Sequence, residues 1–244
     1  MLSKLIDRIG EQNKSCEGFN MKITEYFNNK NIVVEILDGN GFKANTTYKK
    51  FKLGKVRNPY YPTYFKLGYR GVGKYKLSNA DGSSTKAAQC WTDMLDRCYG
   101  EKHKEKYKIY SDCYVDNLWH NFQNFAEWYY DNIYECKEAL NLDKDIKYEN
   151  NKIYSSETCL MVPQSINKHA ICGNGYSWHK RDWIWGAYII ENKKQRSLGQ
   201  FDNKEAAHKT FLDAKNIYWQ SKLEEWRGLL PDNVYIACKN KIFT

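Results

Sequence analysis

The sequence predicts an α+β protein built from three consecutive modules. A basic segment interrupted by Gly and Pro predicts a small β-rich module near the N-terminus. Apolar residues at helical spacing in the middle of the chain predict helices, which lead into a short hairpin and a further helix. Strict alternation of apolar and polar residues near the C-terminus predicts a three-stranded antiparallel sheet followed by a helix. We expect these modules over residues 20–80, 87–170 and 174–227.

Length and composition restrict the class of protein. With 244 residues and 42% hydrophobic content, the chain can build real cores. It has no run of 18 or more apolar residues and no signal-like apolar stretch at its start. We therefore expect a soluble intracellular protein with no membrane partner.

The cysteines are scattered, and no Cys-x-x-Cys pair of the kind that builds a zinc site occurs. We expect mostly free thiols in a reducing compartment, with a disulfide framework as the alternative. The eight cysteines are Cys16, Cys90, Cys98, Cys113, Cys136, Cys159, Cys172 and Cys238.

The charge favours a polyanionic partner. The formal net charge is +9, and aromatic residues make up 16% of the chain. Basic side chains neutralise phosphates and aromatic rings stack on bases or sugars, so the combination is typical of nucleic-acid binding. Because a basic surface also serves solubility, the distribution of the charge matters more than its sum.

The N-terminal module concentrates this charge. Ten basic residues and no Asp or Glu occur between Lys43 and Lys76, whereas a solvated surface without a partner, which is the alternative, normally mixes both signs. Residues 32–37 read as a strand that enters a turn at Asp38-Gly39, and the Gly and Pro residues that follow exclude a long helix. The candidate phosphate contacts are Lys49, Lys50, Lys52, Lys55 and Arg57.

The middle of the chain reads as helical from Ala87, with a second helix over Val115–Tyr130 whose apolar stripe includes Leu118. The charged segment Glu101–Lys108 reads as an exposed loop between them. A hairpin and a helix follow, with Ser155 or Ser156 in the turn. This piece is too small for a core of its own, so we expect it to pack on the preceding aromatic helices.

The C-terminal segment alternates over residues 176–180, 183–190 and 196–201, which predicts three strands of a meander. Asp202 or Asn203 should cap a helix with Ala207, Phe211, Ala214 and Tyr218 along one face. The basic residues expected on the sheet surface away from that helix are His179, Lys180, Arg181, Lys193, Lys194 and Arg196.

This last segment resembles the APETALA or ethylene-response type of DNA-binding domain. The residues that carry the resemblance are Trp178 with His179-Lys180-Arg181, Trp185-Gly186-Ala187-Tyr188-Ile189, Arg196-Ser197-Leu198-Gly199-Gln200-Phe201-Asp202 and Glu205-Ala206-Ala207. In that family the sheet lies in the major groove, which implies DNA contacts from Lys180, Arg181, Trp185, Tyr188 and Arg196, and from His179. For Trp185 and Tyr188 the alternative is packing against the helix.

Residues 87–170 resemble degenerate HNH-type phage proteins, in which aromatic helices precede a ββα metal motif. The matching residues are Trp91, Met94, Leu95, Arg97, Cys98 and Tyr99; Trp119, Phe122 and Phe125; Leu142-Asp143-Lys144-Asp145; Tyr154, Ser155, Glu157, Thr158 and Cys159; and Val162, Gln164, Ile166 and Asn167. The resemblance implies that Asp143 and Asn167 are ligands of one divalent metal ion, most simply Mg²⁺, in the catalytic site.

Two departures from that family bear on catalysis. Lys144 stands where the family has its histidine base, and Thr158 stands where it has its middle asparagine. A lysine is ordinarily protonated at neutral pH, so Lys144 is either a base activated by burial and the metal or a clamp for phosphate. Asp145, His120 and His169 are further candidates for base or ligand, although each is also an ordinary residue for a surface or core.

The resemblances imply a protein that acts on double-stranded DNA in the cytoplasm of a phage-infected or prophage-carrying bacterium. One hypothesis is a homing-type endonuclease or nickase that hydrolyses DNA with a metal ion. The second is a catalytically inactive DNA-binding regulator that keeps the HNH element as a scaffold. A third, RNA binding, suits the first module but not a sheet that reads a groove, because the major groove of A-form RNA is too narrow.

Overall fold

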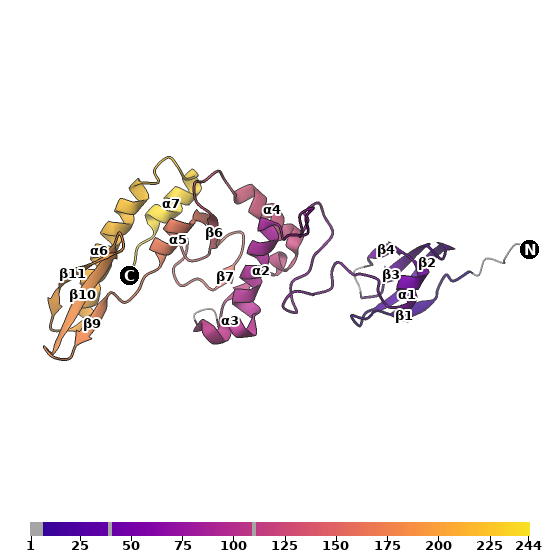
Figure 1. Cartoon of the computed structure of the whole chain (residues 1–244), viewed down its shortest axis with the longest axis horizontal. Coiled ribbons are helices and arrows are strands. Elements are labelled where there is room, and N and C mark those ends of the chain that lie inside the picture. Colours follow the sequence, from indigo (N-terminus) through magenta and orange to yellow (C-terminus); the bar gives the residue numbers. More distant parts are fainter. Residues whose placement is uncertain (1–6, 39–40, 109–110) are drawn as a thin grey trace, which may run out of the picture. The chain divides into compact units, whose positions relative to one another are not determined.

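The computed structural model describes residues 7–38, 41–108 and 111–244, and these fold into two compact units (Figure 1). The first unit runs to Lys74 and includes Asn121–Gln123, and the second comprises Tyr75–His120 and Asn124–Thr244. Both helices and small sheets are present, so the predicted α+β class is confirmed. The predicted central and C-terminal modules belong to the same unit.

The first unit contains a four-stranded antiparallel sheet in the order β1-β2-β3-β4. Its strands are β1 (Gln12–Lys14), β2 (Asn20–Asn28), β3 (Asn31–Ile36) and β4 (Lys43–Thr46). The strand predicted over 32–37 is therefore β3, whereas Gly39 of the predicted turn lies outside the described residues.

One face of this sheet is the core of the first unit. Met21 of β2 pairs in register with Ile36 of β3, and Ile23 pairs with Val34; all four are buried. The short helix α1 (Tyr48–Lys52) covers this face with Phe51, which is fully buried. Thr47 caps α1, as its side chain accepts a hydrogen bond from the backbone N–H of Lys50.

In the second unit, the long helix α2 (Lys86–Tyr99) is followed by α3 (Glu101–Lys106), strand β5 (Tyr114–Val115) and a 3-10 helix (Asn117–His120). Helix α4 (Phe122–Asn132) comes next, and all of it after Gln123 belongs to the second unit. Trp91 of α2 is fully buried and donates from its indole nitrogen to the carbonyl of Trp119, at 2.7 Å. The aromatic side chains of this region thus form a core, as predicted.

Two predictions for this region were wrong. The charged segment after α2 is exposed but helical, as α3. The second helix begins at Phe122 and not at Val115, because the Asn121 side chain accepts a hydrogen bond from the backbone N–H of Gln123 and ends the preceding structure. Leu118 therefore lies outside the apolar stripe and is 68% exposed.

The predicted hairpin and helix are present. Strand β6 (Leu140–Asp143) pairs antiparallel with β8 (Leu160–Pro163), and helix α5 (Gln164–Ala170) follows directly; between them β7 (Ile153–Tyr154) pairs in parallel with β5. Ser155 organises the turn before β8, since its Oγ accepts from the backbone N–H of Thr158 at 3.2 Å.

The C-terminal sheet is the predicted meander, in the order β11-β10-β9. Its strands are β9 (Tyr176–His179), β10 (Ile184–Glu191) and β11 (Lys194–Phe201). The long helix α6 (Lys204–Glu224) packs on one face of this sheet, and Asn203 caps it by accepting from the N–H of Ala206. A residue is skipped at Leu198, which makes a β-bulge between Ala187 and Tyr188.

Helix α6 also packs against the central hairpin. Phe211 and Tyr218 lie against the sheet, while Trp219 and Leu223 enter a second core. That core holds Ile146, Leu160, Val162 and Ile166 of the hairpin region together with Leu230, Phe243 and helix α7 (Asp232–Asn240). The hairpin therefore shares this core with the helices that follow it. Leu140 and Leu142 of β6 also lie beside Cys90 of α2 and Tyr129 of α4, as expected for packing on the preceding helices.

All eight cysteines are free, which agrees with the prediction of unpaired thiols. None of the helices within the described ranges combines the length and the apolar character that a membrane span requires.

Candidate functional site

The basic segment Lys43–Lys76 presents its charges to solvent. All ten basic side chains in it are exposed, namely those of Lys43, Lys49, Lys50, Lys52, Lys55, Arg57, Lys66, Arg70, Lys74 and Lys76. Helix α1 shows how the sequence achieves this: Phe51 is anchored in the core, so the lysines on either side of it point outward. Lys52 is ion-paired with Glu11 at 3.3 Å, an acid from outside the segment.

Several aromatic side chains of this segment pack against other aromatic side chains of the same unit. The ring of Tyr60 contacts those of Phe42 and Tyr69, and Tyr61 contacts Phe19, with centroids 5.9–6.1 Å apart. These tyrosines are half-buried. The segment therefore offers exposed cations more than exposed rings.

The two faces of the C-terminal sheet carry different side chains, and their distribution differs from the one predicted from the sequence. Trp185, Ala187 and Ile189 alternate on the face that α6 covers. His179 and Tyr188 lie on the open face: the ring of His179 is above Gly186, and its Nε2 is 3.3 Å from the Ser177 Oγ. The remaining side chains on the open face are uncharged, at Ile184, Ile190, Gln195, Ser197 and Gln200.

Arg196 is not on the open face, contrary to expectation. The bulge at Leu198 shifts the alternation of β11 by one residue, so Arg196 pairs in register with Ile189 on the side of α6. Its Nε and Nη2 donate to the two carboxylate oxygens of Glu191, both at 2.8 Å. Lys194 lies on the same side, opposite Glu191.

The other predicted basic contacts lie in turns. Lys180 and Arg181 occupy the β9–β10 turn, and Lys193 the β10–β11 turn; all three are exposed. The β9–β10 turn also carries Trp183, which the sequence analysis did not single out. Its side chain is 79% exposed and its backbone is left-handed, with φ 49°. An exposed Trp beside two cations is the signal that could have identified it.

Trp185 lies within an aromatic cluster on the helix side. Its ring is 5.6 Å from that of Tyr176, which in turn contacts His208 of α6 at 5.3 Å. Packing towards the helix, the alternative considered for Trp185, is therefore what the structure has.

The three residues proposed for catalysis line one cavity of about 670 Å³ in the second unit. We call it the Asp143 cavity. Asp143 ends β6, Lys144 follows it, and Asn167 projects from α5. The structure adds Arg97, His103, Lys152 and Lys241 to its wall. Arg97 belongs to the first group of residues that resemble HNH-type proteins, but none of the four was predicted as a site residue.

Asp143 serves the backbone around it. Its Oδ1 accepts hydrogen bonds from the N–H groups of Asp145 at 2.8 Å and Ile146 at 2.7 Å, which fixes the turn after β6. Burial raises the pKa of the Asp143 carboxyl above its ordinary range, although these two hydrogen bonds act in the opposite direction.

Lys144 is a buried hydrogen-bond donor. Its Nζ donates to Asp145 Oδ1 at 2.7 Å and to the backbone carbonyl of Asn151. A general base must accept a proton, whereas this amino group is held by two acceptors. The Asn151 side chain completes the arrangement, since its amide nitrogen donates to the carbonyls of Lys144 and Ile153. The loop is thus held by the side chain of Asn151, and Thr158, which stands where the family has its middle asparagine, donates its hydroxyl to the carbonyl of Ile153.

Asp143 and Asn167, the two predicted ligands, do not by themselves make a complete site for a metal ion. Asp143 is the only carboxylate of the two predicted ligands, and its Oδ1 already accepts hydrogen bonds from two backbone N–H groups. The buried side chains of Lys144 and Lys241 line the same cavity, and their positive charges oppose a cation. Across the described ranges, no three His, Cys, Asp or Glu side chains gather as a metal site. The predicted Mg²⁺ stays a prediction.

The burial of Asp143 gives a test by pH. Because its pKa is raised in the folded state, the folded protein binds a proton more tightly than the unfolded chain, and stability falls as pH rises above about 4, the unfolded value. Asp143→Asn keeps an acceptor at Oδ1 and cannot ionise. We expect this variant to gain stability over the parent as pH rises from 4 to 7, measured by urea unfolding.

Asp143→Ala is the matched comparison, as it leaves the N–H groups of Asp145 and Ile146 without their acceptor. It should be about 1–3 kcal/mol less stable than Asp143→Asn at neutral pH. If Asp143→Asn instead loses stability against the parent as pH rises, the carboxylate is stabilised by a cation and not penalised by burial.

We compared the chain with protein-family models, with curated proteins and with solved structures, and none of them matches it.

Proposed function

We propose that this chain binds double-stranded DNA and does not hydrolyse it. One observation carries the proposal: ten basic side chains between Lys43 and Lys76 are exposed, and no acidic residue interrupts them. Exposed cations neutralise phosphates and release counterions, which is the main source of sequence-independent DNA affinity. The β9–β10 turn, with Lys180, Arg181 and Trp183, supplies a second group of contacts.

A duplex suits this surface better than a single strand does. Proteins that bind single strands stack successive bases on exposed aromatic rings. Here Tyr60, Tyr61 and Tyr69 are packed against other rings of their own unit. The exposed groups are mainly cations, which recognise the backbone of a duplex.

The Asp143 cavity supports the scaffold hypothesis over the nuclease hypothesis. Asp143 and Asn151 hold backbone groups, and Lys144 donates to two acceptors, so each has a structural task. The resemblances to HNH proteins and to the APETALA or ethylene-response type of domain remain predictions about ancestry. A DNA-binding protein of the regulatory kind, acting in a bacterial cytoplasm, is the function that fits them without catalysis.

The first test concerns the basic segment. Replacing Lys49, Lys50 and Lys55 by Gln should weaken duplex binding and flatten the slope of log affinity against log salt by about 0.9 for each lost phosphate contact. Fluorescence anisotropy of a labelled duplex over a salt series measures this slope. The control replaces three exposed lysines elsewhere, Lys102, Lys209 and Lys239, and has the same net charge. Equal slopes for the two triple variants would remove the basic segment from the interface.

The second test compares the basic residues of the β9–β10 turn with Arg196, which is ion-paired with Glu191. Lys180→Gln with Arg181→Gln should lower the salt slope by up to about 2, because both side chains are exposed and, among the described residues, Arg181 has only one hydrogen bond to an acid, from its Nε to Asp182 at 3.1 Å. Arg196→Gln should change it little, since Glu191 already binds that guanidinium. A loss of slope in Arg196→Gln as large as in the double variant would mean that Arg196 leaves Glu191 for a phosphate.

The third test is for hydrolysis. The purified protein should leave supercoiled plasmid, phage DNA and bacterial genomic DNA uncut in the presence of Mg²⁺ or Mn²⁺, while it retards the same DNA in a gel. Cleavage that needs the metal and disappears in Asp143→Ala would restore the nuclease hypothesis and make Asp143 a metal ligand.

A further inference from the structure

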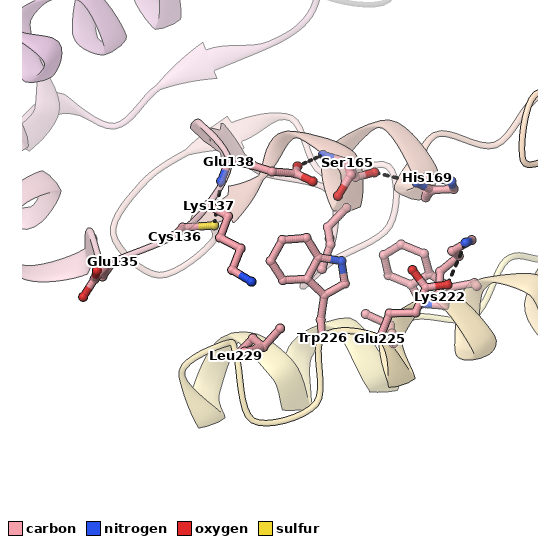
Figure 2. Close-up of a pocket in the computed structure, with 13 residues that line it drawn as sticks. Glu135, Cys136, Lys137, Glu138, Ser165, His169, Lys222, Glu225, Trp226 and Leu229 are labelled. Atoms are coloured by element: carbon pink, nitrogen blue, oxygen red, sulfur yellow. Dashed lines mark hydrogen bonds and ion pairs between the residues drawn. The ribbon is translucent and has the colours of Figure 1, made fainter.

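A second cavity of about 670 Å³ lies in the second unit (Figure 2), and His169, a candidate base or ligand in the sequence, is one of its lining residues. We call it the Trp226 pocket. Its walls are residues 135–138, which connect α4 to β6, then α5, and the C-terminal end of α6 with the turn that follows. No residue lines both this pocket and the Asp143 cavity. The volume is in the range of sites for small organic molecules.

The floor of the pocket is apolar and aromatic. Ile166, Trp219 and Leu223 are buried in the core beneath it, and Trp219 is fixed by a 2.9 Å hydrogen bond to the carbonyl of Cys238. Trp226 is only half-buried, and Figure 2 shows its indole in the middle of the pocket, with Leu229 at one side. A partly exposed indole face over a rigid floor suits a flat aromatic ring.

Most charged groups at the rim are already engaged. Lys222 is ion-paired with Glu225 at 2.7 Å, and Glu138 accepts a hydrogen bond from the backbone N–H of Ser165 at 2.8 Å. Figure 2 shows the Glu135 carboxylate pointing away from Trp226. The Glu138 carboxylate keeps its charge but is held at the start of α5, and Glu135 points away, so the charged group that faces Trp226 is the amino group of Lys137.

Two polar groups remain for a ligand. The Lys137 amino group points into the pocket in Figure 2, and within the described part of the chain it has no acidic partner. The hydroxyl of Ser165 is buried and, among the described residues, has no hydrogen-bond partner. A cation and an unused hydroxyl beside an aromatic floor are complementary to an anionic aromatic molecule.

We propose that the Trp226 pocket binds a small organic acid with a flat aromatic body. The aromatic ring of the ligand lies against Trp226 and Leu229, and its acid group forms an ion pair with Lys137. An acceptor atom of the ligand accepts a hydrogen bond from the Ser165 hydroxyl. This site does not depend on DNA binding.

The experiment uses the full chain without DNA and two fluorescent probes of similar shape. Anilinonaphthalene sulfonate has the aromatic body and the anion, and phenylnaphthylamine has the body without the anion. Lys137→Gln should weaken the sulfonate about tenfold, as expected for the loss of one charge-assisted hydrogen bond, and leave the neutral probe unchanged. Trp226→Ala should weaken both probes. Lys239→Gln, on the exposed side of α7, is the charge control and should change neither.

The outcomes distinguish this site from the DNA surface. If sulfonate affinity is unchanged in Lys137→Gln and falls in the triple variant at Lys49, Lys50 and Lys55, the probe binds the basic segment and the proposal is wrong. Equal binding of both probes to Lys137→Gln and to the parent, with loss in Trp226→Ala, would replace the organic acid by a neutral apolar ligand and would also overturn it. Circular dichroism of each variant confirms that the fold is intact.

Discussion

The second unit depends on one helix that is apolar on two sides. Helix α6 places Phe211 and Tyr218 against the C-terminal sheet and Trp219 and Leu223 in the core of the central hairpin. A hairpin of this size cannot bury enough apolar surface alone, and a three-stranded sheet needs a helix on one face. Both requirements are met by the same helix, which therefore links the sheet to the hairpin.

Much of the fold could be predicted because it follows from local patterns. Alternation gave the meander, and the cap at Asn203 gave the start of α6. The errors come from single residues that override a pattern. Asn121 starts α4 later than the apolar spacing suggests, and the bulge at Leu198 moves Arg196 to the other face of the sheet. This bulge inserts one extra residue into the strand, and no characteristic residue type marks it, so the sequence alone does not reveal its position.

The site was predicted in part. The positions of Asp143, Lys144 and Asn167 in one cavity follow from a strand, a turn and a helix that are close in sequence. What could not be predicted is how each side chain is used. The hydrogen bonds from Asp145 and Ile146 to Asp143, and the carbonyl of Asn151 opposite Lys144, depend on the path of a loop that has no repeating pattern. That path turns residues typical of a reaction centre into supports of the backbone.

The Asp143 cavity can be completed only after most of the second unit has been synthesised. Arg97 lies on α2, whereas Lys241 and Phe243 come after α7, so the wall joins residues separated by most of the second unit. Phe243 is tied to α6 by two reciprocal hydrogen bonds with the Asn216 side chain, at 2.9 and 3.0 Å. During synthesis the hairpin therefore leaves the ribosome long before its partners, and its apolar face stays uncovered until α6, α7 and the residues after them have emerged.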